Sequence, residues 1–252
     1  MGKTRWRPAW WLLGAVMAAP MPVAAQDGFL FREPRMTLTF HIGYDAPLGP
    51  RSTNGDNDIF EFTQSRLTIG DADHDALSLG GEVAVRVTNR FDVVFDIAHA
   101  SSTTRSEFRD YVDLDDLPIQ QETHFSRNAF TVGGRYFLTE RGVPVGQFAW
   151  VPRSWSPYVG AGVGFMTYEF RQSGDFVDFE TLDIFSTRLR SNDTGPMAHV
   201  LAGLQYSIAP NWILTGEARY RWASAELKSD YIGFDDIDLT GLQATIGFGV
   251  RF

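Results

Sequence analysis

The chain ends in a run, Leu242–Phe252, that alternates strictly between apolar side chains and Gln, Thr, Gly or Arg. An alternation with a period of two predicts a β-strand with one apolar and one polar face. Phe252, the last residue, lies on the apolar face. An exposed aromatic side chain at a strand end is a liability in water and an anchor in lipid, so we expect a strand that crosses a membrane.

The N-terminal segment has the three parts of a secretory signal. Basic residues at 3–7 precede an apolar stretch at 9–19, and small residues end at Ala25. We expect residues 1–25 to be a signal peptide cleaved after Ala25, with residues 26–35 left as a periplasmic stub. The apolar stretch is too short to span about 30 Å of hydrocarbon, and no other run reaches the ~20 apolar residues of a spanning helix.

Composition restricts the partners and the source of stability. The chain of 252 residues has no Cys, so an exported protein of this kind is not held by disulfides. A closed barrel supplies stability in another way, because every backbone donor and acceptor is paired between strands. The net charge of −9 argues against nucleic acid, which requires a basic surface.

The terminal alternation recurs along the chain and predicts eight strands. They are expected near 36–45, 79–88, 91–101, 128–138, 156–170, 196–208, 212–224 and 242–252. Eight is an even number that can close, and each strand is long enough for a tilted membrane crossing. The predicted fold class is therefore all-β, an eight-stranded antiparallel up-and-down transmembrane β-barrel over 36–252. Segments 59–64 and 176–180 leave a ten-stranded barrel as the alternative.

The connections between the predicted strands sort by length. Those after the second and sixth strands are short turns, which face the periplasm in such barrels. Long extracellular loops are expected near 46–78, 102–127, 171–195 and 225–239. The link at 139–155 breaks this pattern, because it is a long periplasmic turn; a packed turn and a small plug are both open interpretations. A soluble β-sandwich or lipocalin-like barrel would also alternate, but it would hide its apolar face inside.

Several short motifs resemble those of uncharacterised bacterial outer-membrane β-barrel-domain proteins, distant relatives of the small OmpA-like and OmpX-like barrels. The motifs are Tyr136–Thr139, Phe148–Pro152, Pro157–Gly162, Gly174–Phe179, Gly216–Tyr220 and Asp238–Gly241. The resemblance implies the bacterial outer membrane as location, with lipid and lipopolysaccharide as neighbours. It also implies that Phe252 is the signal read by the barrel-insertion machinery. It transfers no catalytic residue.

The strand parity points a set of charged side chains into the lumen. The set is Glu82, Arg86, Asp92, Asp96, Arg135, Glu217, Arg219, Arg221 and Arg251. A barrel of eight strands has room for side chains and little more. Since an unpaired buried charge costs several kcal/mol, we expect an ion-pair network that plugs the lumen. A narrow or gated channel is the alternative.

The loops are rich in acidic residues, which we interpret as a solvated outer face able to meet an unknown surface ligand. The alternating carboxylates of Asp71, Asp73 and Asp75 suggest a Ca²⁺ site, with Glu82 twelve residues on as in an EF-hand loop. Ala76 stands where that loop requires glycine, and Glu82 already belongs to a strand. We therefore expect no metal and no cofactor.

One motif raises the question of catalysis. His99 and Ser101, with Glu107 or Glu122 as orienting acid, resemble the site of outer-membrane lipid A deacylases. The Asn that follows the nucleophile in that family is Ser102 here, and the paired acids of outer-membrane proteases are not recognisable. We expect a monomeric, non-enzymatic barrel with a structural or surface-interaction role through its acidic loops. A lipid A hydrolase using His99 and Ser101 is kept as an alternative.

Overall fold

The computed structural model describes residues 28–51, 58–113, 115–146, 149–178 and 181–252. The predicted signal peptide at 1–25, its cleavage after Ala25 and the first two residues of the predicted stub lie outside the described residues.

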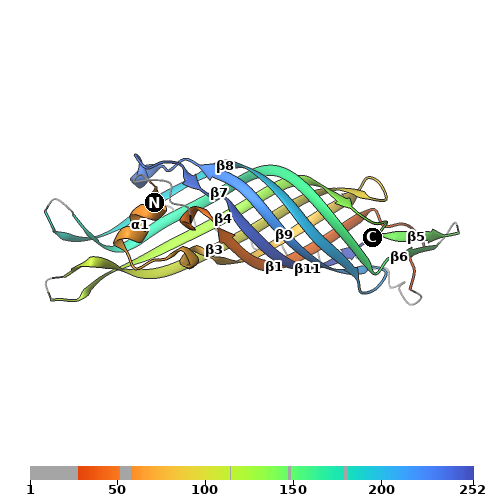
Figure 1. Cartoon of the computed structure of the whole chain (residues 1–252), viewed down its shortest axis with the longest axis horizontal. Helices are drawn as coiled ribbons and strands as arrows, with labels where there is room; N and C mark the ends of the chain where they lie inside the picture. Colours follow the sequence, from red (N-terminus) through yellow and green to blue (C-terminus); the bar gives the residue numbers. More distant parts are fainter. Residues whose placement is uncertain (1–27, 52–57, 114, 147–148, 179–180) are drawn as a thin grey trace, which may run out of the picture.

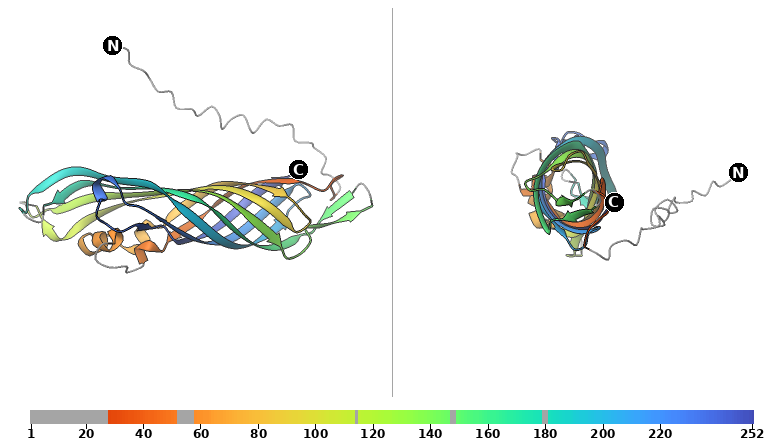
Figure 2. Two further views of the ribbon diagram at one scale, coloured as in Figure 1. Left: turned by 90° about the horizontal axis from the view of Figure 1, so that it is seen from above. Right: turned by 90° about the vertical axis from the view of Figure 1, so that its right-hand side faces the viewer.

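Eight antiparallel strands form a closed ring (Figures 1 and 2). They are β1 (Met36–Pro47), β2 (Ala76–Arg86), β3 (Phe91–Val112), β4 (Pro118–Phe137), β7 (Trp155–Val177), β8 (Ile184–Ser207), β9 (Trp212–Ala225) and β11 (Gly241–Arg251). Each strand pairs with the next along the chain, and β11 closes the ring against β1 with Phe248 opposite Phe40. The predicted eight-stranded up-and-down barrel is confirmed. The ten-stranded alternative is wrong.

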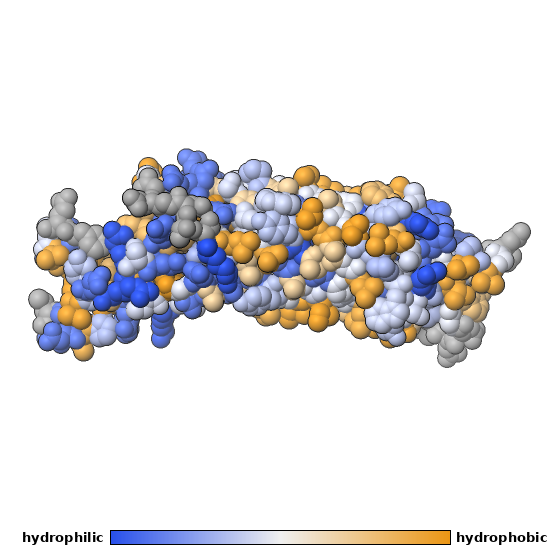
Figure 3. Space-filling view, viewed as in Figure 1, coloured by the Kyte–Doolittle hydropathy of each residue, from blue (hydrophilic) through white to orange (hydrophobic). Residues whose placement is uncertain are grey.

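The wall carries an apolar belt on its outer surface. On β7 the outward positions run from Trp155 through Val159 and Val163 to Phe165, and all four side chains are exposed. At about 3.3 Å per residue and a strand tilt near 40°, this run covers about 25 Å along the barrel axis, the height of the lipid-facing band in membrane barrels. Figure 3 shows apolar residues spread over this part of the wall and hydrophilic residues gathered beyond it.

Alternation places polar side chains behind the belt. Along β1, Phe40 is 59% exposed whereas its neighbour Thr39 is 3% exposed. Strand residues point alternately to the two faces of a sheet, so one face meets lipid and the other fills the lumen. Among the described residues, no helix is long and apolar enough to cross a bilayer.

Two hairpins extend far beyond the belt. β3 and β4 remain paired from Phe91–Tyr136 to Val112–Pro118, and β7 and β8 remain paired as far as Val177–Ile184. The predicted loops at 102–127 and 171–195 are therefore wrong, because most of their residues are strand. The outward positions there are mainly polar, as expected for strands that have left the lipid. The inward positions hold Phe125, Tyr168 and Phe170 together with buried polar side chains such as Gln121 and Gln172.

The described residues of the first loop form three short helices and no strand. They are η3 (Gly49–Arg51), α1 (Ile59–Arg66) and η4 (Asp71–His74). Asp58 caps α1, since its Oδ1 accepts hydrogen bonds from the backbone N–H groups of Phe60 at 2.7 Å and Glu61 at 3.1 Å. The predicted additional strand at 59–64 is wrong because this cap starts a helix. The other candidate, 176–180, begins as the end of β7, and Phe179 and Glu180 lie outside the described residues.

An apolar core fills the outer part of the barrel. Phe60 of α1 packs edge to face on Phe125 and Phe170, with ring centroids 5.7 and 6.2 Å apart. The fourth loop, with η5 (Ser229–Tyr231) and β10 (Ile237–Asp238), adds Tyr231 and Ile237 to the same cluster. We call this cluster the outer core. The interior thus has an apolar part beyond the membrane and a polar part within it.

The long periplasmic link forms a hairpin of β5 (Gly142–Val145) and β6 (Ala149–Pro152). Trp150 of β6 is only 3% exposed. Its backbone forms two hydrogen bonds with Leu30, at 2.8 and 2.9 Å, so the N-terminal segment and this hairpin hold each other at the periplasmic end. The short turns at 87–90 and 208–211 lie at the same end as the C-terminus (Figure 1).

Candidate functional site

The centre of the lumen is occupied by a chain of ion pairs. Arg135 on β4 binds Glu82 on β2 through both ends of its guanidinium, with 2.8 Å between Nη1 and Oε1. Its Nη2 also lies 3.3 Å from Oε2 of Glu217 on β9. All three side chains are at most 8% exposed. A buried charge is stable only when paired and hydrogen-bonded, and the geometry supplies both for this group.

The chain continues through a second arginine. Arg219 Nη2 lies 2.9 Å from Glu217 Oε1, and its Nη1 lies 2.6 Å from Asp96 Oδ1. The other oxygen of Asp96 lies 2.9 Å from His41 Nε2. A Cβ added at Gly80 would lie 2.3 Å from His41 Cε1, so only glycine leaves room for this inward ring. Glu82, Arg135, Glu217, Arg219, Asp96 and His41 are together called the central network.

A second ion-pair group lies nearer the outer core. Asp45 on β1 binds two arginines, with 2.9 Å from its Oδ1 to Arg221 Nη2 and 2.9 Å to Arg127 Nη2. Arg127 is 2% exposed and also donates to the backbone oxygen of His74 in η4 at 3.2 and 3.3 Å. This group therefore connects the barrel wall with η4 of the first loop.

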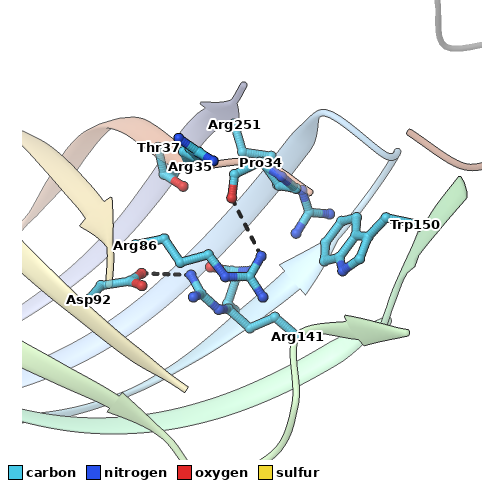
Figure 4. A pocket seen from close by; sticks show the side chains of 9 residues that line it. Pro34, Arg35, Thr37, Arg86, Asp92, Arg141, Trp150 and Arg251 are labelled. Carbon is cyan, nitrogen blue, oxygen red and sulfur yellow. Dashed lines mark hydrogen bonds and ion pairs between the residues drawn. The ribbon is translucent and has the colours of Figure 1, made fainter. Parts of the chain in front are cut away.

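The periplasmic mouth is closed by a third group (Figure 4). Arg141, which precedes β5, lies with its Nη1 2.7 Å from Asp92 Oδ2. The guanidinium carbons of Arg86 and Arg251 lie 5.8 and 5.2 Å from the centre of the Trp150 ring, within the range of cation–π contact. Burial lowers the pKa of Arg141, although the Asp92 charge opposes this. The cavity among these side chains measures about 10 Å³, which is the room of a single water molecule.

The structure places every predicted lumen residue on the inner face. Five belong to the central network, Arg221 binds Asp45, and the remaining three surround the mouth. Four charged or titratable side chains that complete these groups are not among the predicted residues, namely His41, Asp45, Arg127 and Arg141. The inward parity of β1 and β4 carries a signal for the first three. Arg141 lies in a turn, where parity has no meaning.

Phe252 ends the wall as predicted for a terminal strand residue. Its side chain is 59% exposed. Its backbone oxygen accepts hydrogen bonds from the N–H groups of Arg35 at 2.9 Å and Met36 at 3.0 Å. Its role as an insertion signal stays a prediction.

The residues of the catalytic alternative lie on the outer face of the long hairpin. His99 Nδ1 lies 2.8 Å from Asn128 Oδ1. The two candidate acids lie further toward the hairpin tip and have other partners: Glu122 is 3.7 Å from Arg105, and Glu107 accepts a hydrogen bond from Gln120 at 3.2 Å. The structure does not bring these acids to His99.

The suggested calcium loop is not assembled. Asp75 binds Tyr44 and Arg51, and Asp73 accepts a hydrogen bond from the N–H of Gly70 at 2.7 Å. Glu82, the proposed twelfth-position ligand, lies in the lumen with Arg135. Within the part of the chain that the structure describes, no group of three or more His, Cys, Asp or Glu side chains is arranged to hold a metal ion.

His74 is the one titratable side chain of η4 that is buried in the outer core. Its ring lies 5.1 Å from that of Phe60 and 5.9 Å from that of Phe125. Burial, together with the nearby positive charge of Arg127, lowers the pKa of His74 to about 4. The imidazole is therefore neutral at neutral pH.

A closed wall of eight antiparallel strands with an apolar outer belt defines an integral β-barrel protein of the bacterial outer membrane, the class and location that the sequence predicts. No protein-family model matches the chain, and no curated protein matches it. The solved structures to which the chain is similar include three outer-membrane proteins. Neisserial surface protein A is 14% identical over 86% of this chain and 96% of its own, with a TM-score of 0.46. The attachment invasion locus protein Ail of Yersinia pestis is 13% identical over 88% and 100%, with a TM-score of 0.44. The N-terminal barrel domain of Pseudomonas aeruginosa OprF is 14% identical over 88% and 100%, with a TM-score of 0.38.

Proposed function

We propose that this protein is a non-enzymatic outer-membrane barrel whose lumen is plugged and which acts through the hairpins and acidic loops raised above the membrane. The observation that carries the proposal is the filling of the lumen at successive levels. The outer core, the Asp45 group, the central network and the mouth around Trp150 follow one another along the barrel axis.

The free space left between these levels is small. The cavities beside the central network measure about 10 Å³ each, as does the one at the mouth. Each holds about one water molecule. Because a hydrated ion is much larger, its passage would require the ion pairs to separate.

The hairpins support a role outside the membrane. Acidic side chains cluster at their ends, with Asp110, Asp113, Asp115 and Asp116 on the β3–β4 hairpin and Asp175, Asp178 and Asp183 on the β7–β8 hairpin. Carboxylates at the tip of a rigid, paired strand are presented to solvent at a fixed height. Such a surface suits contact with a cationic ligand.

Conductance in a planar bilayer tests the plug. We expect no steady openings from the wild-type barrel and openings from the double variant Glu82→Ala/Arg135→Ala, which removes a buried ion pair of the central network. The control is Arg105→Ala/Glu122→Ala, which removes an ion pair of the outer face and should remain silent. Steady openings of the wild-type protein would overturn the plug and favour the channel alternative.

The lipid A composition of cells tests the absence of hydrolase activity. We expect identical lipid A mass spectra from cells that express the wild-type protein, cells that express Ser101→Ala and cells that lack the gene. Loss of an acyl chain that depends on Ser101 would establish the hydrolase alternative instead.

A further inference from the structure

The outer face of the long hairpins changes character immediately beyond the lipid belt. Ile97, Phe130 and Phe165 lie side by side on β3, β4 and β7 and form the last apolar row. The next outward rows carry mainly hydroxyl, amide and imidazole side chains. They are His99, Asn128, Thr167 and Thr194, followed by Ser101, Ser126, Glu169 and Asn192.

Arginines gather beyond these polar rows. Arg171 on β7 lies opposite Arg190 on β8, and Arg188 follows on the same face of β8. Arg105 on β3 lies in the same row of paired residues as Arg188, and Glu122 on β4 and Ser173 on β7 lie between them in that row. We call Arg105, Arg171, Arg188 and Arg190 the arginine patch. The side chains of Arg105 and Arg190 are 88% and 54% exposed.

The arginine patch is a local concentration of guanidinium groups in an acidic chain. Glu169 lies 3.5 Å from Arg171 and 3.0 Å from Arg190, and Glu122 lies 3.7 Å from Arg105. Two further carboxylates border the patch: Asp230 accepts a hydrogen bond from the backbone N–H of Arg190 at 2.8 Å, and Glu107 accepts one from Gln120 at 3.2 Å. His124 lies beside the arginines, and its pKa is lowered by partial burial and by Arg171, so we do not count it as a charge. Four guanidinium groups thus gather on one face of a chain whose net charge is −9.

The height of the patch above the lipid identifies its neighbour. Arg171 follows Phe165 by six residues, or about 20 Å of strand and about 15 Å along the membrane normal at a tilt near 40°. The head-group layer of a phospholipid bilayer is only about 5–8 Å thick on each side. A phospholipid phosphate therefore lies below the patch, whereas a lipid with a tall sugar head group reaches it.

We propose that the arginine patch binds phosphate groups on the sugar head group of the glycolipid that forms the outer leaflet, with the hydroxyl and amide rows lying against its sugars. Guanidinium groups bind phosphate through two parallel hydrogen bonds and remain charged at every physiological pH. The patch lies on the wall and faces along the membrane plane, where the head groups of neighbouring lipids surround it. This inference does not depend on whether the lumen is plugged.

The test compares two triple variants with the same change in charge. R171Q/R188Q/R190Q removes most of the patch, and R32Q/R90Q/R153Q removes three exposed arginines at the periplasmic end. The purified, detergent-solubilised barrel is titrated with purified lipopolysaccharide, and the dissociation constant is measured. Each variant is checked for folding on detergent gels, where a folded barrel migrates faster in the unheated sample than in the boiled one.

We expect the patch variant to bind at least about tenfold more weakly and the periplasmic variant to bind within about twofold of wild type, since each basic side chain near an anionic head group contributes to binding. R171K/R188K/R190K should restore part of the loss. Glu169→Gln should bind more tightly, because it removes a carboxylate that competes for two arginines.

The same titrations are repeated with chemically dephosphorylated lipopolysaccharide and with an anionic phospholipid. Wild type should bind dephosphorylated lipopolysaccharide as weakly as the patch variant binds the intact molecule, and anionic phospholipid should not distinguish wild type from the patch variant. Equal affinities of wild type and the patch variant for intact lipopolysaccharide would overturn the proposal. An equal loss in the periplasmic variant would also overturn it, because the effect would then be one of net charge.

Discussion

Arg219 and Asp96 form an ion pair across the lumen, with 2.6 Å between Nη1 and Oδ1. They belong to β9 and β3, between which β11, β1 and β2 lie in the ring. The pair therefore connects parts of the wall that have no backbone hydrogen bond in common. Within the membrane, packing of this barrel rests on charged side chains that would be absent from the core of a soluble sheet.

Removing one partner of this pair should destabilise the barrel strongly. Asp96→Ala leaves the buried Arg219 with Glu217 alone, and we expect a loss of about 3 kcal/mol in the free energy of unfolding. Urea unfolding in lipid micelles, followed by Trp fluorescence, measures the change. Glu122→Ala breaks an exposed ion pair and should cost less than about 1 kcal/mol. Similar losses in both variants would contradict a structural role for the central network.

Trp150 should stabilise the mouth through its size and not through its indole N–H. The ring is 3% exposed, and its Nε1 has no hydrogen-bond partner in the described structure. We expect Trp150→Ala to lower the free energy of unfolding by about 3 kcal/mol and Trp150→Phe to lower it by less than half as much. If Phe proves as harmful as Ala, the N–H has a partner in solution that this structure does not show.

The outer core should weaken as the pH falls. His74 has a pKa of about 4 in the folded protein, whereas an unfolded histidine titrates near 6.5. The unfolded chain therefore binds more protons between these values, so the contribution of neutral His74 is complete above about pH 6.5 and is lost as the pH falls toward 4. The loss amounts to about 3 kcal/mol.

The measurement for His74 is a difference between two stability profiles, since other groups also titrate in this range. His74→Phe keeps an aromatic ring against Phe60 and Phe125 but cannot take up a proton. Its unfolding free energy should fall less steeply than that of wild type between pH 6.5 and pH 4. Parallel profiles would show that His74 has the same pKa in the folded and unfolded protein, which would contradict its burial in the outer core.

Single cysteines can establish the orientation, because the chain contains no Cys. Asp115 and Thr181 lie at the tips of the long hairpins, and Asn89 lies in the short turn between β2 and β3. On intact cells a membrane-impermeant maleimide should label Asp115→Cys and Thr181→Cys but not Asn89→Cys. The reverse pattern would place the hairpins in the periplasm.

The sequence pattern predicts the part of each strand that faces lipid. From Leu242 to Phe252, and at Phe91 to Ile97, apolar residues alternate with polar ones, and the parity read from them agrees with the exposed and buried positions of the structure. The sequence pattern did not predict that the strands extend into the hairpins, because the outer face of the extensions meets water and not lipid. Phe125 and Phe170 point inward there, while Arg171 faces outward, so the segments look like loops when a lipid-facing pattern is sought.

Strand parity predicted only those residues of the candidate site that lie within the predicted strands. Asp96 and Arg135 lie well inside predicted strands, and their inward direction follows from their neighbours. Arg127 stands one residue before a predicted strand, so its inward direction follows only when the parity of that strand is extended backwards. Arg141 lies in a turn, and the sequence offers no direction for it. The segment 59–64 entered the ten-stranded alternative as a possible strand because Ile59, Phe60 and Phe62 look like a short apolar run, whereas the structure has a helix over Ile59–Arg66. The Asp58 cap is the signal that distinguishes it.

The reversal of polarity along the long strands has a consequence for how their pairing is specified. A strand that slips by one residue exchanges its two faces. In β7 such a slip would turn Glu169 and Arg171 inward against the outer core and move Phe170 into water. The same slip would turn Val163 and Phe165 into the charged lumen. A single slip would thus be destabilising in the lipid-facing part of the strand and again in the water-facing part. Misaligned pairings are therefore disfavoured along the whole strand.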